Sequence, residues 1–310
     1  MFRHSLVPLV GSNSACSQAT WKYLKRVPET NPTVVVLTAL PVEYDAMRAH
    51  VEDVEELVHD DGTRVERGRL GGTPWTVAIA ELGEGAVNAA ALTMRIVSWL
   101  RPQALLFVGV AGGLRDDVEI GDVVVGTKVY AVQGGKQTPS GFLARPEVWH
   151  GSHRLLQAAR SALRDLEGVR GHHKPIACGD VVLADDRSAF AEYIRRTYND
   201  AYAIEMEGSG AAHAAHLSGQ LDALVIRGIS DRANPGKHAA DASGSQKRAA
   251  AQVASVAVAV LRKHRPRGPG DSEEGPHRGP QYGGDHLDFR GSTFHGPFVA
   301  KRVERGDGEW

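Results

Sequence analysis

Two apolar segments of strand length constrain the fold of this chain more than any other feature of its sequence. Residues 33–40 read TVVVLTAL and residues 103–114 read QALLFVGVAGGL. Neither segment alternates polar with apolar residues, so each predicts a central strand that is covered on both faces. Segments with helical patterns lie between strands of this kind along the chain. We therefore predict an α/β fold, a three-layer α/β/α sandwich with a mixed central sheet.

The remaining segments between residues 33 and 264 complete this alternation. Gly71-Gly72 marks the turn of a hairpin, Ser152 is a candidate N-cap, and Gly219 ends a helix of small residues. The predicted helices cover residues 44–57, 86–100, 152–166, 188–198, the second half of 201–219, and 246–264. The predicted strands lie in residues 63–82 (a hairpin), 119–132 (a strand pair), 174–186, the first part of 201–219, and 221–234.

The domain organisation follows from changes in composition. Residues 33–264 form the predicted folded domain, preceded by an N-terminal extension, 1–32, that we expect to be flexible. Half of the residues in 265–284 are Gly or Pro, which predicts a linker that does not pack. Residues 285–310 are too few to bury a core alone, so we expect either a disordered tail or a docking peptide for a protein partner.

Charge and cysteine content exclude several classes of protein. The formal net charge is −1, which argues against binding to nucleic acid or to an anionic membrane surface. No apolar run approaches the ~20 residues of a membrane span, and the N-terminal run LVPLV is too short for a signal peptide. The two cysteines, Cys16 and Cys178, form no disulfide framework, so a cytoplasmic location is the expectation. We expect Cys178 to behave as a small buried apolar residue.

Common cofactor and hydrolase motifs are missing or incomplete. GEGAVNAA, at 83–90, has Asn88 where a dinucleotide fingerprint requires its third Gly, and neither a Walker pattern nor a G-x-S-x-G elbow occurs. His213 and His216 share a predicted helix, but no third metal ligand lies near them in the sequence. We place the other histidine pair, His172 and His173, in an exposed turn. No metal or organic cofactor is implied. GVAGGL, at 109–114, is either a tight turn or an anion-binding nest of N–H groups.

Carboxylates gather at the ends of three predicted strands. Glu43 follows the first strand, Glu205 and Glu207 follow another, and Asp231 ends a third. Ligands of open α/β sheets bind outside the carboxyl ends of strands, so one shared site is expected. Each acid also has a purely local interpretation. Glu43 and the EME segment can stabilise helix N-termini, and Asp231 can form an Asx turn.

Five motifs occur in an order that is specific to one family. They are TALPVEYDAM, VGVAGGL followed by IGDVVV, CGDVVLAD, AIEMEGSGAAHAA and VIRGISDRAN. With these motifs, residues from about 33 to 264 resemble the 5′-methylthioadenosine/S-adenosylhomocysteine nucleosidases of the nucleoside phosphorylase-I superfamily. The resemblance implies hydrolysis of the N-glycosidic bond of a purine (adenine) nucleoside to free base and sugar. It also implies a homodimer in which the neighbouring subunit closes the pocket.

The resemblance assigns roles to individual residues. Glu43 activates the attacking water, and Asp231 protonates N7 of the departing purine with Ser230 positioning it. In the EME segment, Glu207 binds the sugar hydroxyls. The implied substrate-binding residues are Glu205, Met206, Glu207, the backbone of Val182 and Leu183, Ser230, Ala39, Leu40, Val110 and Gly112. The chemistry suits these residue types, because an acid must neutralise the base while a carboxylate activates water, as in inverting glycosidases.

Three alternatives remain open at this point. Phosphate could replace water, although Val110 supplies no hydroxyl and Glu43 repels a phosphate dianion. The substrate could be a nucleotide such as AMP or ATP, because the chain carries terminal extensions and lacks an aromatic at Val182. Lys136, Arg187 and Lys237 are then the candidates for phosphate contacts at the pocket mouth. The chain could also be a non-catalytic nucleoside-binding sensor.

Overall fold

The computed structural model describes residues 32–219 and 221–268. The chain divides into two units, 1–266 and 267–310, and all the elements below belong to the first. The predictions for the N-terminal extension, for most of the linker and for the C-terminal tail fall on residues outside the described ranges. They stay predictions.

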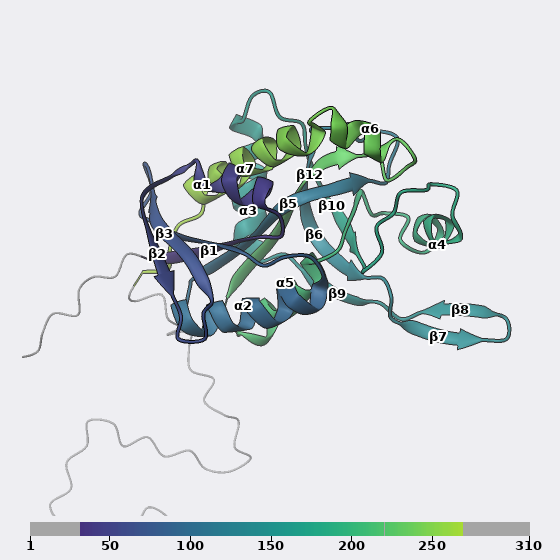
Figure 1. The fold of residues 1–310 in the computed structure, drawn as a ribbon, viewed down its shortest axis with the longest axis horizontal. Helices are drawn as coiled ribbons and strands as arrows, with labels where there is room; N and C mark the ends of the chain where they lie inside the picture. Colours follow the sequence, from purple (N-terminus) through teal and green to yellow (C-terminus); the bar gives the residue numbers. More distant parts are fainter. Residues whose placement is uncertain (1–31, 220, 269–310) are drawn as a thin grey trace, which may run out of the picture. The chain divides into compact units, whose positions relative to one another are not determined.

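A mixed sheet of ten strands forms the centre of the fold (Figure 1). Its main path runs β11-β10-β6-β12-β5-β1-β4-β3-β2, and β9 pairs with β6. The strands are β1 (Thr33–Thr38), β2 (Val51–Val58), β3 (Arg64–Leu70), β4 (Thr76–Glu81), β5 (Ala104–Gly113), β6 (Val123–Ala131), β9 (Glu147–His150), β10 (Gly171–Cys178), β11 (Ala203–Glu205) and β12 (Asp222–Asp231). The central strands β1, β4, β5 and β12 are parallel, and their residues are almost all buried, as the continuous apolar runs predict.

Strand β11 closes part of this sheet on itself. It pairs with β10 in parallel and with β5 in the antiparallel direction, so β5, β12, β6, β10 and β11 form a ring. Ile204 lies opposite Gly112, and Asp231 on β12 also lies opposite Gly112. The ring therefore brings the EME, GVAGG and ISD segments to the same level, although they are far apart in sequence.

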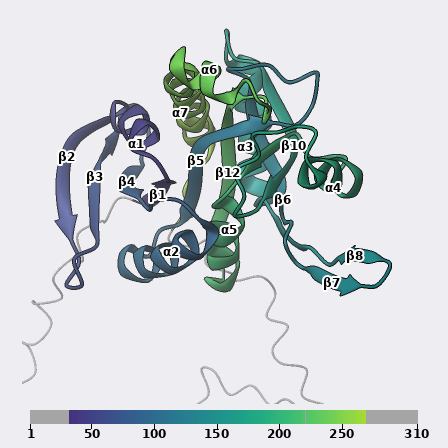
Figure 2. The same cartoon turned by 45° about the vertical axis from the view of Figure 1, so that its right-hand side comes forward.

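Helices cover both faces of the sheet and complete the three layers that the sequence predicts (Figures 1 and 2). On one face lie α1 (Pro41–Arg48), α3 (His153–Asp165) and α7 (Ser245–Lys263), and on the other α2 (Ala86–Leu100) and α5 (Gly208–Leu217). Gly210 allows α5 to approach α2, because a Cβ there would overlap the Ala86 carbonyl. Within the described ranges, no helix is long and apolar enough to cross a membrane.

The helix predicted over residues 44–57 is wrong in its second half. Helix α1 ends at Arg48, and residues 51–58 form the edge strand β2. The register shifts between Glu52 and Glu55, where Asp53 has a φ of 52°. This bulge places Val51, Val54 and Leu57 on one side at a spacing of three, which imitates a helical pattern. Ion pairs from Arg64, Arg67 and Arg69 of β3 to the acidic side chains of β2 support the strand.

Other local predictions also need correction. Residues 119–132 contain one strand, β6, and not the predicted strand pair, because β6 runs through Gly126 without a turn. A Cβ at Gly126 would crowd Ile176 and the Val225 carbonyl. His172 and His173 lie in β10, not in an exposed turn, and His172 Nε2 is 2.7 Å from Asp122 Oδ2.

Ser152 does precede α3, but its hydroxyl accepts from Ala223 N–H and caps no helix. Four short elements were not predicted: β7 (Gly135–Thr138) and β8 (Gly141–Ala144), which form a hairpin, β9, and α6 (Lys237–Ala242). The helix predicted over residues 188–198 is present as α4 (Ala189–Thr197).

Candidate active site

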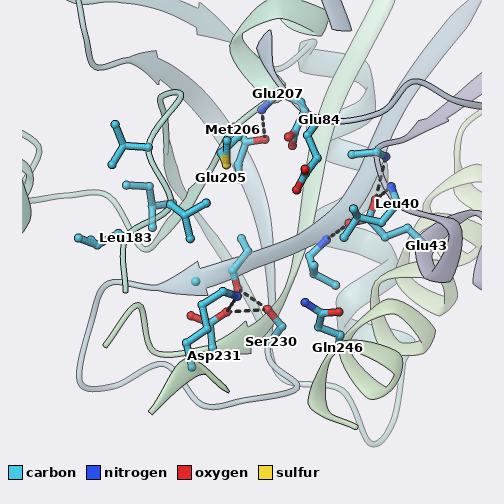
Figure 3. Close-up of a pocket in the computed structure, with 18 residues that line it drawn as sticks. Leu40, Glu43, Glu84, Leu183, Glu205, Met206, Glu207, Ser230, Asp231 and Gln246 are labelled. Atoms are coloured by element: carbon cyan, nitrogen blue, oxygen red, sulfur yellow. Dashed lines mark hydrogen bonds and ion pairs between the residues drawn. The ribbon is translucent and has the colours of Figure 1, made fainter. Parts of the chain in front are cut away.

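One pocket collects nearly all the residues that the sequence analysis selected (Figure 3). It lies where the carboxyl ends of β1, β5, β11 and β12 meet, as expected for an α/β sheet. The predicted residues that line it are Ala39, Leu40, Glu43, Val110, Gly112, Val182, Leu183, Glu205, Met206, Glu207, Ser230 and Asp231. Glu84, Ala111, Val181, Ile204, Lys237 and Gln246 complete the lining.

Glu43 is held from three sides by backbone N–H groups. Ala39 and Leu40 donate to Oε2 at 2.8 and 3.0 Å, and Val110 donates to Oε1 at 2.7 Å. Glu43 is also the third residue of α1, so it caps that helix and faces the pocket at once. Burial raises the pKa of Glu43, although the Arg227 guanidinium and the three N–H groups oppose the shift. A carboxylate with a raised pKa is a stronger base for activating water.

A buried arginine sits among three glutamates below the pocket. Arg227 is fully buried, and its Nη2 hydrogen-bonds Glu205 and lies 3.6 Å from Glu207 Oε2. Its charge also acts on Glu43. Gly109 makes this approach possible, because a Cβ there would overlap Arg227 Nη1 and come within 2.7 Å of Glu43 Oε1. One cation thus offsets part of the charge of three buried carboxylates.

Glu205 and Glu207 have different surroundings. Glu205 Oε2 accepts from the N–H groups of Glu207 and Gly208 and from Arg227, so it anchors the start of α5. Glu207 accepts a single hydrogen bond from the backbone, from Gly85 N–H at 3.1 Å. Burial, opposed by Arg227, raises the pKa of Glu207 to about 7. Glu207 therefore keeps more acceptor capacity toward the pocket than Glu205 does.

Asp231 at the end of β12 is positioned by three donors. Ala233 N–H donates to Oδ1 at 2.8 Å, which is the Asx turn that the sequence allowed. Ser230 Oγ is 3.0 Å from Oδ2, and Lys237 Nζ donates to Oδ2 at 2.8 Å. The Asp231 side chain is only 3% exposed. Figure 3 shows Asp231 and Glu43 reaching the pocket from separate elements.

The pocket wall opposite Glu43 is apolar. Leu183 is buried beside the pocket, whereas Val182 is 57% exposed at its rim. Figure 3 shows Met206 next to Glu205 and Glu207, with its sulfur toward the pocket. Gly112 packs against Asp231, since a Cβ there would lie 3.1 Å from Oδ1. This wall can cover a flat base or a sugar ring without competing hydrogen bonds.

The buried Arg227 and the contact of Lys237 with Asp231 were not predicted from the sequence. The signal for Arg227 was present, because a charged residue within the apolar run LVIRGIS must be buried with a partner. Of the three predicted phosphate-binding candidates, only Lys237 lines this pocket. Arg187 is 86% exposed beside Asp185, and Lys136 lies in the β7–β8 hairpin. Cys178 is buried as predicted, and burial raises the pKa of its thiol.

The sequence of the folded part of the chain matches a known protein family. Residues 33–262 match the family model of the phosphorylase superfamily. The chain belongs to the phosphorylase superfamily. The match covers all the elements of this superfamily member from β1 almost to the end of α7, including every residue of the pocket.

Several relatives of this superfamily member are nucleosidases. A 5′-methylthioadenosine/S-adenosylhomocysteine nucleosidase of Chromohalobacter salexigens is 28% identical over 209 residues, 64% of this chain and 83% of that protein. The ATP nucleosidase Cap17 of Escherichia coli is 29% identical over 74% of this chain, which spans only 50% of Cap17. The crystal structure of the Neisseria meningitidis 5′-methylthioadenosine/S-adenosylhomocysteine nucleosidase with methylthio-immucillin-A aligns with a TM-score of 0.66. That alignment has 26% identity and covers 74% of this chain and 98% of the other.

Proposed function

We propose that this protein hydrolyses the N-glycosidic bond of a purine nucleoside and releases the free base and the sugar. The observation that carries this proposal is the placement of Asp231 and Glu43 in one pocket, which Glu207 also lines. Two buried carboxylates with separate partners can divide the work of acid and base. The nucleosidase relatives support the same reaction class.

The mechanism assigns one task to each carboxyl group. Asp231 donates a proton to N7 as the bond from the sugar to the purine breaks, and the electron pair of that bond stays on the purine. Glu43 takes a proton from the water that attacks the sugar carbon. Glu207 accepts hydrogen bonds from the ribose hydroxyls, and its negative charge stabilises the cation that develops on the sugar.

Water is a better nucleophile than phosphate for this pocket. Three carboxylates surround the site proposed for the nucleophile, those of Glu43, Glu205 and Glu207. Within the described ranges, the only cation among them is the guanidinium of Arg227. A phosphate dianion would enter a region of net negative charge, which costs binding energy. Val110 presents its N–H to Glu43 and has no hydroxyl that could bind phosphate. These contacts support hydrolysis over phosphorolysis.

The same charges favour a nucleoside over a nucleotide as the substrate. Five carboxylates line the pocket, those of Glu43, Glu84, Glu205, Glu207 and Asp231, while Lys237 is the cation that lines it. Lys237 is already paired with Asp231 and with Asp241. Glu84 lies beside Glu207, the residue proposed to bind the ribose hydroxyls, because the next N–H along the chain, that of Gly85, binds Glu207. A 5′-phosphate near Glu84 would be repelled, so we favour a nucleoside of the methylthioadenosine type.

Base release from a substrate panel tests the function. We expect free adenine from methylthioadenosine, S-adenosylhomocysteine or adenosine without added phosphate. We expect kcat/KM for AMP and ATP to be at least about tenfold lower, because like charges in a pocket cost more than 1.4 kcal/mol. Glu84→Gln is the matched variant, and it should reduce the difference in kcat/KM between nucleosides and nucleotides. Phosphate-dependent release would contradict the role of Glu43, and no release from any substrate would favour a sensor.

The raised pKa of Glu207 predicts pH-dependent binding. An adenine C-nucleoside, whose glycosidic bond resists hydrolysis, should bind about tenfold more tightly at pH 8 than at pH 6. The reason is that only about one tenth of a carboxyl group with a pKa of about 7 is ionised at pH 6, and the ionised form binds the hydroxyls. Isothermal titration calorimetry would measure this. Glu207→Gln should abolish the pH dependence of binding, and Glu43→Gln should keep most of it. The reverse pattern would contradict the proposed binding of the ribose hydroxyls by Glu207.

We also propose that two copies of this chain associate. Three exposed apolar side chains support this: Val87 and Met94 on α2 are 80% and 40% exposed, and Leu217 on the adjacent α5 is 64% exposed. A second copy is the simplest cover for such a patch. Sedimentation velocity of the full chain should give the mass of a dimer, and a monomer at micromolar concentration would contradict it.

The two-cysteine composition keeps a cytoplasmic location as our expectation.

A further inference from the structure

Lys237 contacts the proposed acid directly. Its Nζ lies 2.8 Å from Asp231 Oδ2 and 3.6 Å from Asp241 Oδ2, and its side chain is 21% exposed. It opens the short helix α6, six residues beyond Asp231, and lines the pocket. The contact therefore depends on the turn that follows β12, which carries Lys237 back over the end of that strand.

Each oxygen of the Asp231 carboxyl group has a hydrogen-bond partner. Oδ1 accepts from Ala233 N–H, while Oδ2 receives Lys237 Nζ and lies beside Ser230 Oγ. The charged groups that face the ammonium are Asp231 from β12 and Asp241 from α6, and α7 contributes the uncharged Gln246 to the same pocket. Burial opposes the charge on Lys237, but the hydrogen bonds and charges of Asp231 and Asp241 raise the pKa of its ammonium.

We propose that Lys237 is a positioning residue for Asp231, one that orients its carboxyl group and stabilises the carboxylate that remains after the proton is transferred. This inference rests on the proposed hydrolase function. When the bond to the sugar breaks, the purine keeps the electron pair and takes the proton from Asp231. The carboxylate that remains is stabilised by the ammonium of Lys237, which makes the proton easier to give away. The next proton reaches Asp231 from water through the open side of the pocket.

The proposed role separates Lys237 from a purely structural lysine. Without the ammonium at 2.8 Å, the carboxylate that forms as the proton leaves is less stabilised, and the carboxyl group is less well oriented. The loss should therefore appear in kcat, and only for substrates whose leaving group needs a proton. A purely structural lysine would affect every substrate alike.

The test compares Lys237→Met, Lys237→Arg and Lys247→Met in the full chain, with the nucleoside that the wild type cleaves best. Lys247 lies exposed on α7, so its variant removes the same charge away from Asp231. For Lys237→Met we expect kcat to fall about ten- to a hundredfold, short of the ~10²–10⁴-fold that a general acid supplies, with little change in KM. Lys237→Arg should keep most of the activity, and Lys247→Met should match the wild type.

A second substrate separates acid catalysis from general disturbance. A riboside of a good leaving group, such as 4-nitrophenol, needs no proton at N7, so Lys237→Met should cleave it nearly as fast as the wild type does. Equal losses on both substrates would overturn the proposal, as would an unchanged kcat. A rise in KM confined to AMP or ATP would instead make Lys237 a phosphate ligand and also overturn it. If the wild type released no base at all, the proposed function would fail first.

Discussion

Replacing Asp231 with Asn should lower kcat for an adenine nucleoside by about 10²–10⁴-fold, because the amide cannot donate a proton of comparable acidity to the leaving base. The amide oxygen can still accept from Ala233 N–H, so the turn after β12 should persist. KM should change little, since Glu207, the residue proposed to bind the sugar hydroxyls, is untouched. Steady-state kinetics of adenine release, with circular dichroism to check folding, would measure the effect.

Two controls make this result specific to Asp231. Asp241→Asn removes the other carboxylate beside Lys237, and it should leave kcat within about threefold of the wild type, because Asp241 lies outside the pocket lining. The 4-nitrophenyl riboside should be cleaved by Asp231→Asn almost as well as by the wild type, since 4-nitrophenolate departs without a proton. A large loss on that substrate, or nearly full activity on the nucleoside, would remove Asp231 from the role of acid.

Replacing Arg227 with Met should lower the free energy of unfolding by about 3–5 kcal/mol at pH 8, because three buried carboxylates lose their shared cation. The guanidinium also lies 4.3 Å from the centre of the Phe107 ring, and that contact is lost as well. Urea unfolding at fixed pH would measure the loss. Arg262→Met, which removes an exposed arginine of α7, should change stability by less than about 0.5 kcal/mol.

The pH dependence of this loss gives a further check. Burial already raises the pKa of Glu43 and of Glu207, so the folded protein holds protons there more tightly than the unfolded chain does. Stability from such groups is present at low pH and is lost as the pH rises through their folded pKa values. Arg227→Met should raise the pKa values of Glu43 and Glu207 further. The loss in free energy of unfolding that it causes should therefore be smaller at pH 5.5 than at pH 8. Adding Glu205→Gln should recover part of the deficit at pH 8; a deficit that is independent of pH would argue against the charge interpretation.

Much of the fold is predictable from local sequence patterns. The strand over residues 33–38, the helix over 86–100 and the hairpin around Gly71-Gly72 appear where the patterns place them. Each depends on burial or turn chemistry that repeats at the period of its own element. Residues 51–58 show the limit of this reasoning, because the bulge at Asp53 converts a strand period of two into a spacing of three. Only pairing with β3 distinguishes that pattern from a helix.

Part of the candidate site is likewise predictable from the sequence. Glu43, Glu207 and Asp231 are identifiable from the sequence, because acids that follow buried strands collect at one edge of an α/β sheet. Their local and functional interpretations turn out to be compatible. Glu43 caps α1 and also faces the pocket, and Asp231 forms an Asx turn while lying at its other side. A helix cap and a catalytic carboxylate need the same thing, a carboxyl group held by N–H donors at the end of a strand.

The amino-acid sequence by itself determined the alternation of strands and helices, the superfamily to which the resemblance points, and the acids that reach the pocket. Only the tertiary structure decided how those acids are charged and held. Arg227 meets three glutamates because β12 runs beside β5 with Arg227 opposite Gly109, and Lys237 reaches Asp231 because the chain turns back after β12. Charge interactions depend on distance and burial in space, and neither quantity is encoded in the spacing of residues along the chain.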